Sequence, residues 1–147
     1  FQRALAHYND MVVDKRIGLH LGGREPVAGL ISLFQSLLNE PGDAAYGCLL
    51  TNCAVEFAGQ DSLAGAAVSA GFDRLLHAFK AVLMSLPDAR EDWAERASLR
   101  LLTFYQGLLV LIRHGHDKAA LHETIEPEIE AILGVGRAFT GPPKGKR

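Results

Sequence analysis

The chain shows a helical pattern of apolar positions along most of its length. Apolar residues recur every three or four positions, the spacing that places them on one side of an α-helix. Stretches rich in glycine, proline, asparagine and aspartate interrupt this pattern at residues 22–26, 39–43, 59–61, 87–88 and 114–117. We find no alternation of apolar and polar residues between hairpin turns, which would indicate β-strands. The sequence therefore predicts an all-α fold, a bundle of about six helices.

Local signals mark the ends of the first four predicted helices. The first spans residues 1 to about 21, and Pro26 suits the first turn of the second, where its missing N–H would have been unpaired. Pro41 ends this second helix. The third covers residues 46–58, and Asp61 can cap the fourth.

The last two predicted helices carry a capping signal and a proline. Asp88 and Glu91 have the spacing of a capping box, so we expect them to start a helix that runs to about residue 114. The final helix begins near Asp117. Pro127 lies inside its pattern and removes a backbone donor, so we expect a kink or a new helix start there.

Length and composition fit one domain. The chain has 147 residues, of which 48% are hydrophobic and 22% are charged, enough to bury one core. We expect this domain to cover residues 1–136. Residues 137–147 are rich in glycine, proline and lysine and are predicted to be disordered.

Charge and cysteine content narrow the class of protein. The formal net charge is −2, so the chain alone has no excess positive charge with which to hold DNA or an anionic membrane. The longest apolar stretch, residues 101–112, is too short to span a bilayer. Cys48 and Cys53 stand among apolar neighbours, which favours inert thiols and a reducing, cytoplasmic setting. Because the first residue is Phe1, we expect a longer or a processed gene product.

The last two helices carry more apolar surface than one core normally uses. The fifth is apolar around most of its second half, and the sixth has an apolar seam at four- and three-residue spacing. A second copy of the chain could cover this surface, which predicts a symmetric homodimer. The predicted interface residues are Leu101, Tyr105, Leu108, Leu109, Ile112, Leu121, Ile125, Ile129 and Ile132.

One segment resembles a known family. Residues 46–57, YGCLLTNCAVEF, are similar to the pattern G-C-L-L-x-N-x-A-x-E of many tetracycline-repressor (TetR) family regulators, and Gln106-Gly107-Leu108 in a long helix agrees with their order. The resemblance implies an effector-binding and dimerisation region, with a four-helix bundle between subunits. It also implies that a helix-turn-helix domain, absent from this chain, would precede Phe1 and make all contacts to DNA.

The resemblance further implies a cavity for a small apolar effector inside each subunit. Residues expected to contact the effector lie on the helices that enclose the family's site, and Gln106 and His77 are further polar possibilities. For any single aromatic residue, plain core is the commoner role. The predicted ligand-binding residues are Phe34, Asn52, Glu56, Phe57, Phe72, Leu76, Phe79, Phe104 and Tyr105.

Other chemistry finds little support. His114, His116, His122 and Glu126 are close in sequence, but their spacing is not that of a zinc or di-iron motif. No nucleophile elbow or phosphate-binding loop is present, so we expect neither an enzyme nor a cofactor. Three hypotheses follow: a ligand-responsive regulator, generally a repressor in this family; a stand-alone helical dimer that binds a protein or a lipid-like molecule; and a metal-dependent helical enzyme, which is the least favoured.

Overall fold

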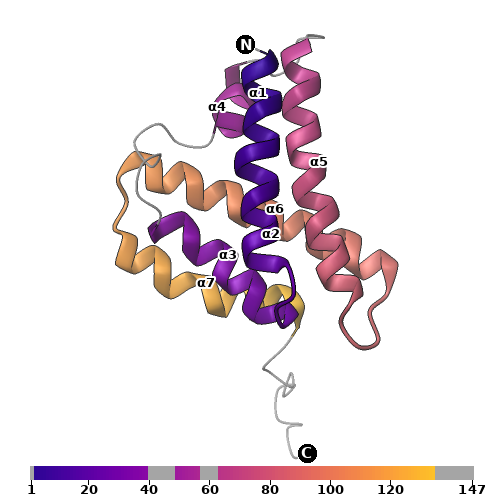
Figure 1. The fold of residues 1–147 in the computed structure, drawn as a ribbon. Coiled ribbons are helices and arrows are strands. Elements are labelled where there is room, and N and C mark those ends of the chain that lie inside the picture. The colour runs from indigo at the N-terminus through magenta and orange to yellow at the C-terminus, as the bar shows by residue number, and fades with distance from the viewer. Residues whose placement is uncertain (1, 40–48, 57–62, 135–147) are drawn as a thin grey trace, which may run out of the picture.

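The computed structural model describes residues 2–39, 49–56 and 63–134, and this part of the chain is helical without any strand. The first three elements form one continuous helix, so the described part of the chain has six helices (Figure 1). The prediction of an all-α fold with about six helices is confirmed. The elements are α1 (Gln2–Tyr8), the π-helical segment η1 (Asn9–Asp14), α2 (Lys15–Leu21), α3 (Pro26–Asn39), α4 (Leu49–Glu56), α5 (Leu63–Met84), α6 (Glu91–His114) and α7 (Lys118–Leu133).

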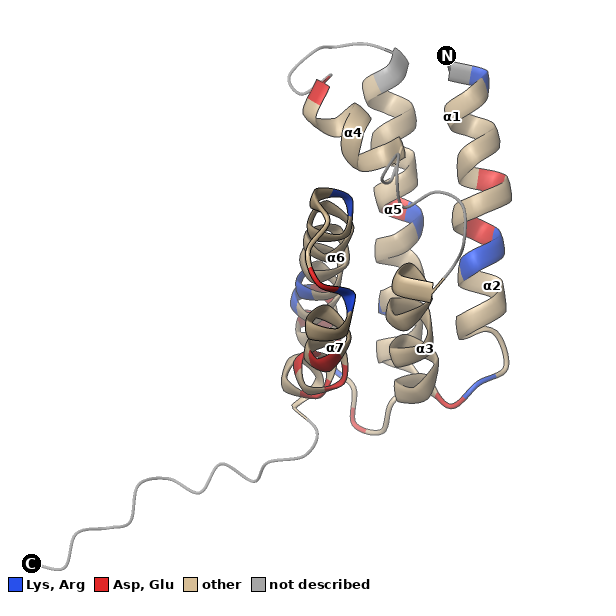
Figure 2. Cartoon of the chain, turned by 90° about the vertical axis from the view of Figure 1, so that its left-hand side faces the viewer, with Lys and Arg blue, Asp and Glu red and all other residues tan. Residues whose placement is uncertain are grey.

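The helices pack in three layers. Figure 2 shows the continuous helix from α1 to α2 on one side, α5 and α3 in the middle, and the pair α6 and α7 on the other side. The helix α5 contacts both outer layers, and α3 packs against α2, α6 and α7. The short helix α4 lies at one end, in contact with α1, α5 and α6 (Figure 1). This position makes α4 and α6 neighbours, which matters for the site described below.

One hydrophobic core runs between the layers. Every helix except α2 contributes at least one side chain that is completely or almost completely buried. Burial of such side chains supplies the main favourable free energy of folding. The largest hydrophobic side chains that are fully buried in this core are Leu5, Leu30, Leu33, Phe34, Leu50, Phe79, Leu83, Leu101, Leu108, Ile125 and Ile129.

Two predicted helix starts are confirmed and a third is wrong. Pro26 is the first residue of α3, as expected. Asp117 caps α7, because its carboxylate accepts hydrogen bonds from the backbone N–H groups of Ala119 and Ala120, both at 3.3 Å. The capping box of Asp88 and Glu91 is not formed. Asp88 instead occupies a turn with φ of 57°, a left-handed conformation that aspartate tolerates better than most residues, and α6 begins only at Glu91.

Pro127 does not start a helix. It lies inside α7, which is continuous from Lys118 to Leu133. Pro127 is exposed, as is Glu123, whose carbonyl would have accepted the missing hydrogen bond, so water can solvate this group. The buried residues Ile125 and Ile129 hold the helix to the core on either side of the proline.

The π-helical segment η1 was not predicted, and it is fastened to α5. The Asn9 side chain is buried and donates to the Ala67 carbonyl at 3.1 Å. On the outside, Arg74 lies 2.7 Å from both Asp10 and Asp14. The hydrogen bond that Arg74 donates to Asp10 raises the pKa of Arg74 further above its usual value, so its guanidinium stays charged near neutral pH. No described helix is both long and apolar enough to cross a bilayer.

Candidate functional site

Four of the predicted ligand-binding residues pack their rings against one another; three are buried in the core and Phe104 is half-buried at its edge. Phe34 stacks on Phe104, with ring centroids 5.4 Å apart, and meets Tyr105 edge-on at the same distance. Phe79 lies 6.0 Å from Phe34 and 6.2 Å from Tyr105. These are the spacings at which aromatic pairs attract one another. The four rings therefore fill space for each other, as the plain-core alternative expects.

The remaining predicted ligand-binding residues are dispersed. Phe72 and Leu76 are half-buried on α5. Leu76 lines a shallow groove of about 360 Å³ between α5 and α6, together with His77, Lys80, Glu95, Ser98 and Leu99. Lys80 crosses this groove to Glu91 at 3.0 Å and Glu95 at 3.1 Å, which raises its pKa. Phe57 lies outside the described residues.

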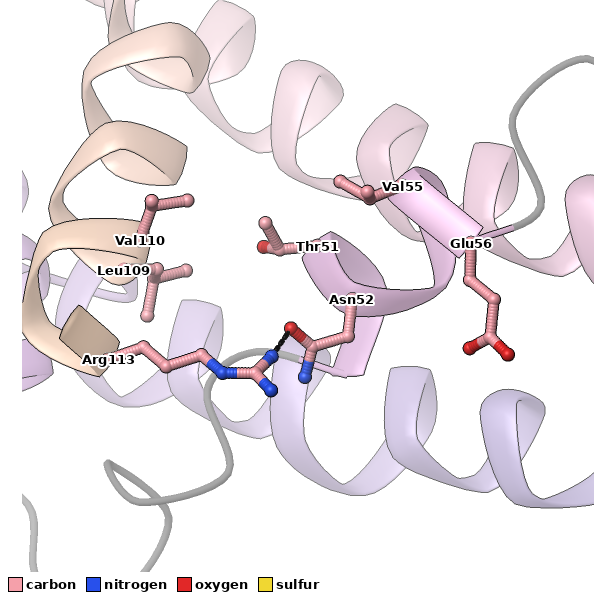
Figure 3. Close-up of a pocket in the computed structure, with 7 residues that line it drawn as sticks. All are labelled: Thr51, Asn52, Val55, Glu56, Leu109, Val110 and Arg113. Atoms are coloured by element: carbon pink, nitrogen blue, oxygen red, sulfur yellow. Dashed lines mark hydrogen bonds between the residues drawn. The ribbon is translucent and has the colours of Figure 1, made fainter.

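Asn52 and Glu56 line a second groove, between α4 and α6, and this is the best candidate site. Its volume is about 400 Å³, within the range of small-molecule sites. Figure 3 shows how the two helices face each other across it. Its lining residues are Thr51, Asn52, Val55 and Glu56 from α4, and Leu109, Val110 and Arg113 from α6.

The groove has a polar end and an apolar wall. At the polar end, Arg113 donates a hydrogen bond from Nη1 to Asn52 Oδ1 (Figure 3). Between the same two helices, the Thr51 hydroxyl donates to Gln106 Oε1, while Gln106 Nε2 is buried without a hydrogen-bond partner. The wall consists of apolar side chains that remain in water, since Val55 is 80% and Val110 52% exposed. Exposed apolar side chains that face each other across a groove favour an apolar occupant.

The core holds α4 in the position that forms this groove. Leu50 and Cys53 on its inner side are buried, which agrees with the expectation that Cys53 is an inert thiol; Cys48 lies outside the described residues. Leu50 packs over Gly71 of α5. A Cβ at Gly71 would lie 2.6 Å from both terminal carbons of Leu50 and 2.7 Å from Asn9 Oδ1. The absence of a side chain at Gly71 therefore lets α4 and η1 approach α5.

Gly71→Ala should lower the free energy of unfolding by about 1–2 kcal/mol, because over-packing costs about 1–3 kcal/mol and better helix propensity returns up to about 1 kcal/mol. Urea denaturation followed by circular dichroism measures this change. Gly18→Ala is the matched control, since a Cβ at Gly18 meets nothing within 4 Å, and this variant should gain about 0.5–1 kcal/mol. Equal gains in both variants would contradict the close packing of α4 on α5.

The predicted dimer-interface residues lie inside the chain's own core. All of them except Leu109 are buried, and Leu109 is half-buried in the wall of the α4–α6 groove. The helices α6 and α7 turn these residues toward each other and toward α3 and α5, so they have little surface left for a second chain. The buried set is Leu101, Tyr105, Leu108, Ile112, Leu121, Ile125, Ile129 and Ile132.

The side of α6 that faces away from the core has apolar residues that are exposed to water. Leu99, Val110 and Leu111 are 58%, 52% and 40% exposed, and Thr103 and Gly107 lie between them at helical spacing. Thr103 is exposed, and its hydroxyl donates to the Leu99 carbonyl of the same helix at 2.9 Å. A Cβ at Gly107 would meet nothing within 4 Å. We call these five residues the α6 outer stripe.

Metal ligands are not assembled in the described part of the chain. His114, His116, His122 and Glu126 are all exposed, and no group of three histidine, cysteine, aspartate or glutamate side chains within residues 2–39, 49–56 and 63–134 could hold a metal ion.

No known protein family, curated protein or solved structure matches the chain.

Sequence reasoning missed Thr51, Val55, Val110 and Arg113 as groove residues and assigned Leu109 to the dimer interface. A signal for two of them was present. Val55 and Val110 are branched apolar residues that fall off the buried stripes of their helices. Arg113 carries no such signal, because a basic residue in the last turn of a helix is common.

Proposed function

We propose that this chain is the effector-sensing and dimerisation region of a ligand-responsive transcription regulator, a repressor that resembles the TetR family. One observation carries the proposal: Val110 belongs both to the α4–α6 groove and to the α6 outer stripe. An occupant of the groove and a second chain on the stripe would therefore touch the same turn of α6. This arrangement supports communication between ligand binding and subunit pairing.

The expected ligand is a small, mainly apolar molecule, and the expected assembly is a homodimer. A regulator needs only a modest difference in ligand affinity between two dimer arrangements. Coupling of about 1–3 kcal/mol changes the affinity of a second site by roughly 5- to 150-fold. A few altered contacts around Val110 are sufficient for an effect of this size.

Contact with DNA belongs to a separate helix-turn-helix module in this proposal. The chain has 15 basic and 17 acidic residues, so it has no excess of positive charge to replace the counterions of DNA. Its part is to pair the subunits and to sense the ligand. The cytoplasm is the expected location, since there the regulator meets DNA.

A reporter experiment tests the proposal. The chain is fused to a helix-turn-helix module that binds its operator only when a fused partner dimerises it. The fusion should repress the reporter at least about tenfold better than the module alone, because pairing raises the effective concentration of the second module at the operator. A library of small apolar compounds is then screened for relief of repression.

Two results would contradict the proposal. One is a fusion that represses no better than the module alone although circular dichroism shows folded helices. The other is repression that no compound relieves although calorimetry shows that some of the compounds bind the chain. The second result would instead support the stand-alone helical dimer.

A further inference from the structure

We propose that the α4–α6 groove binds a small amphipathic anion, an apolar molecule with one carboxylate, and that Arg113 anchors the carboxylate. This inference deepens the proposed function, and it rests on that function only for the consequence of binding. The inference is based on the position of the Arg113 guanidinium, which a hydrogen bond orients beside the exposed apolar wall of the groove. The polar contacts predicted from the sequence did not specify whether the ligand carries a charge.

Arg113 has the chemistry and the orientation for a carboxylate. Its hydrogen bond to Asn52 Oδ1 directs the guanidinium from α6 toward α4, as Figure 3 shows. The guanidinium has five N–H donors in a planar fork, which matches the two oxygens of a carboxylate. Arg113 also lies in the last turn of α6, where the partial negative charge of the helix end favours a cation.

The other charged residue of the groove is placed differently. Glu56 stands at the far end of α4, and Figure 3 shows its carboxylate directed away from Val110 and Arg113. The remaining lining residues, Thr51, Asn52, Val55, Leu109 and Val110, are neutral. The charge that faces the space between the two helices is therefore positive.

The apolar wall selects for a hydrophobic body attached to the anion. Val55 and Val110 are among the most exposed apolar residues that the structure describes, and with Leu109 they face the same space (Figure 3). An inorganic anion would leave these side chains in water. A molecule that combines a carboxylate with an apolar chain would cover them, and each buried CH₂ contributes roughly 0.8 kcal/mol.

Three probes that differ in the head group test the inference. Isothermal titration calorimetry is performed with octanoate, octanamide and octylamine on the intact chain, at concentrations where the probes are monomeric. Octanoate should bind about tenfold more tightly than octanamide, because hydrogen bonds to charged groups are stronger than those to neutral ones. Octylamine should bind more weakly than both. Equal binding of all three, preference for octylamine, or no binding would overturn the inference.

Two variants of Arg113 locate the anchor. Arg113→Gln should remove the preference, lowering the affinity for octanoate about tenfold and that for octanamide less than about twofold. Arg113→Lys should keep part of the preference, since it keeps the charge but loses the fork. The matched control is Arg100→Gln, an exposed arginine of the same helix outside the groove. An unchanged preference in Arg113→Gln, or an equal loss in Arg100→Gln, would contradict the proposal.

A variant of the apolar wall tests the contribution of the ligand's apolar body separately from that of its carboxylate. Val55→Asn should weaken octanoate and octanamide to the same extent, about threefold or more, because it removes apolar surface without changing charge. Val55 is so exposed that this change leaves the core intact. Loss of octanoate binding alone would contradict the assigned wall. The reporter fusion distinguishes the two proposals: repression without octanoate binding overturns only this inference, whereas octanoate binding without repression overturns only the regulator.

Discussion

Phe34→Ala is expected to lower the free energy of unfolding by about 3–5 kcal/mol, the usual cost of truncating a buried phenylalanine. Phe34 is completely buried and contacts the rings of Phe79, Phe104 and Tyr105. Its removal would leave a cavity where α3, α5 and α6 meet, and three rings would lose a partner. Because single domains are stable by only about 5–15 kcal/mol, the variant should be close to unfolding. Urea denaturation at low temperature measures the loss.

Two further variants define what this loss means. Phe34→Leu keeps most of the volume and should lose less than half as much stability as Phe34→Ala. Val55→Ala changes an exposed side chain on α4 and should stay within about 0.5 kcal/mol of the wild type. If Phe34→Ala cost less than about 1 kcal/mol, the rings would not form the core, and the predicted effector cavity around them would become the better interpretation.

Helical periodicity was sufficient to predict the fold class and the helices. The intervals between apolar residues place Leu30, Phe34 and Leu37 on one side of α3, and all three are buried. The start of the last helix near Asp117 was predicted from the break in the apolar pattern at residues 114–117, and Asp117 is the N-cap residue of α7. Such signals are local, so the sequence alone contains them.

Features that depend on contacts between helices could not be read from the sequence. The π-helical segment η1 follows from the packing of Asn9 on α5 and from the ion pairs of Arg74. Nothing in the residues 9–14 themselves distinguishes this segment from ordinary α-helix. Asp88 has the spacing of a cap, but the turn after α5 needs a left-handed residue there. In each case a tertiary requirement replaced a local preference.

The candidate site was predicted only in part, for the same reason. An apolar stripe on a helix shows that a surface is covered, but its spacing does not say whether the same chain or another chain covers it. Leu108 and Ile112 were therefore assigned to a dimer interface, although they close the chain's own core. Asn52 and Glu56 do line the groove. Arg113, which donates a hydrogen bond to Asn52, lies 61 positions from it in the sequence, and only the fold brings these two residues together.

Replacing both Leu99 and Leu111 with glutamate should turn the proposed homodimer into a monomer. These residues mark the two ends of the α6 outer stripe and are 58% and 40% exposed. In a symmetric dimer each change occurs twice, so four leucine side chains leave the interface. If each contributes about 1 kcal/mol, somewhat less than full burial of a leucine, the dissociation constant rises roughly a thousandfold. Sedimentation equilibrium at micromolar concentration measures this change.

The matched control places the same two charges elsewhere. Leu19 and Met84 are as exposed as the stripe residues but lie on α2 and α5, so Leu19→Glu with Met84→Glu should leave the dimer intact. A general effect of added negative charge would weaken association in both double variants. Only a dimer contact through α6 predicts that the Leu99 and Leu111 double variant dissociates while the Leu19 and Met84 double variant remains a dimer. A wild-type chain that sediments as a monomer would remove the dimer from the proposal, because the outer stripe would then have no partner of its own kind.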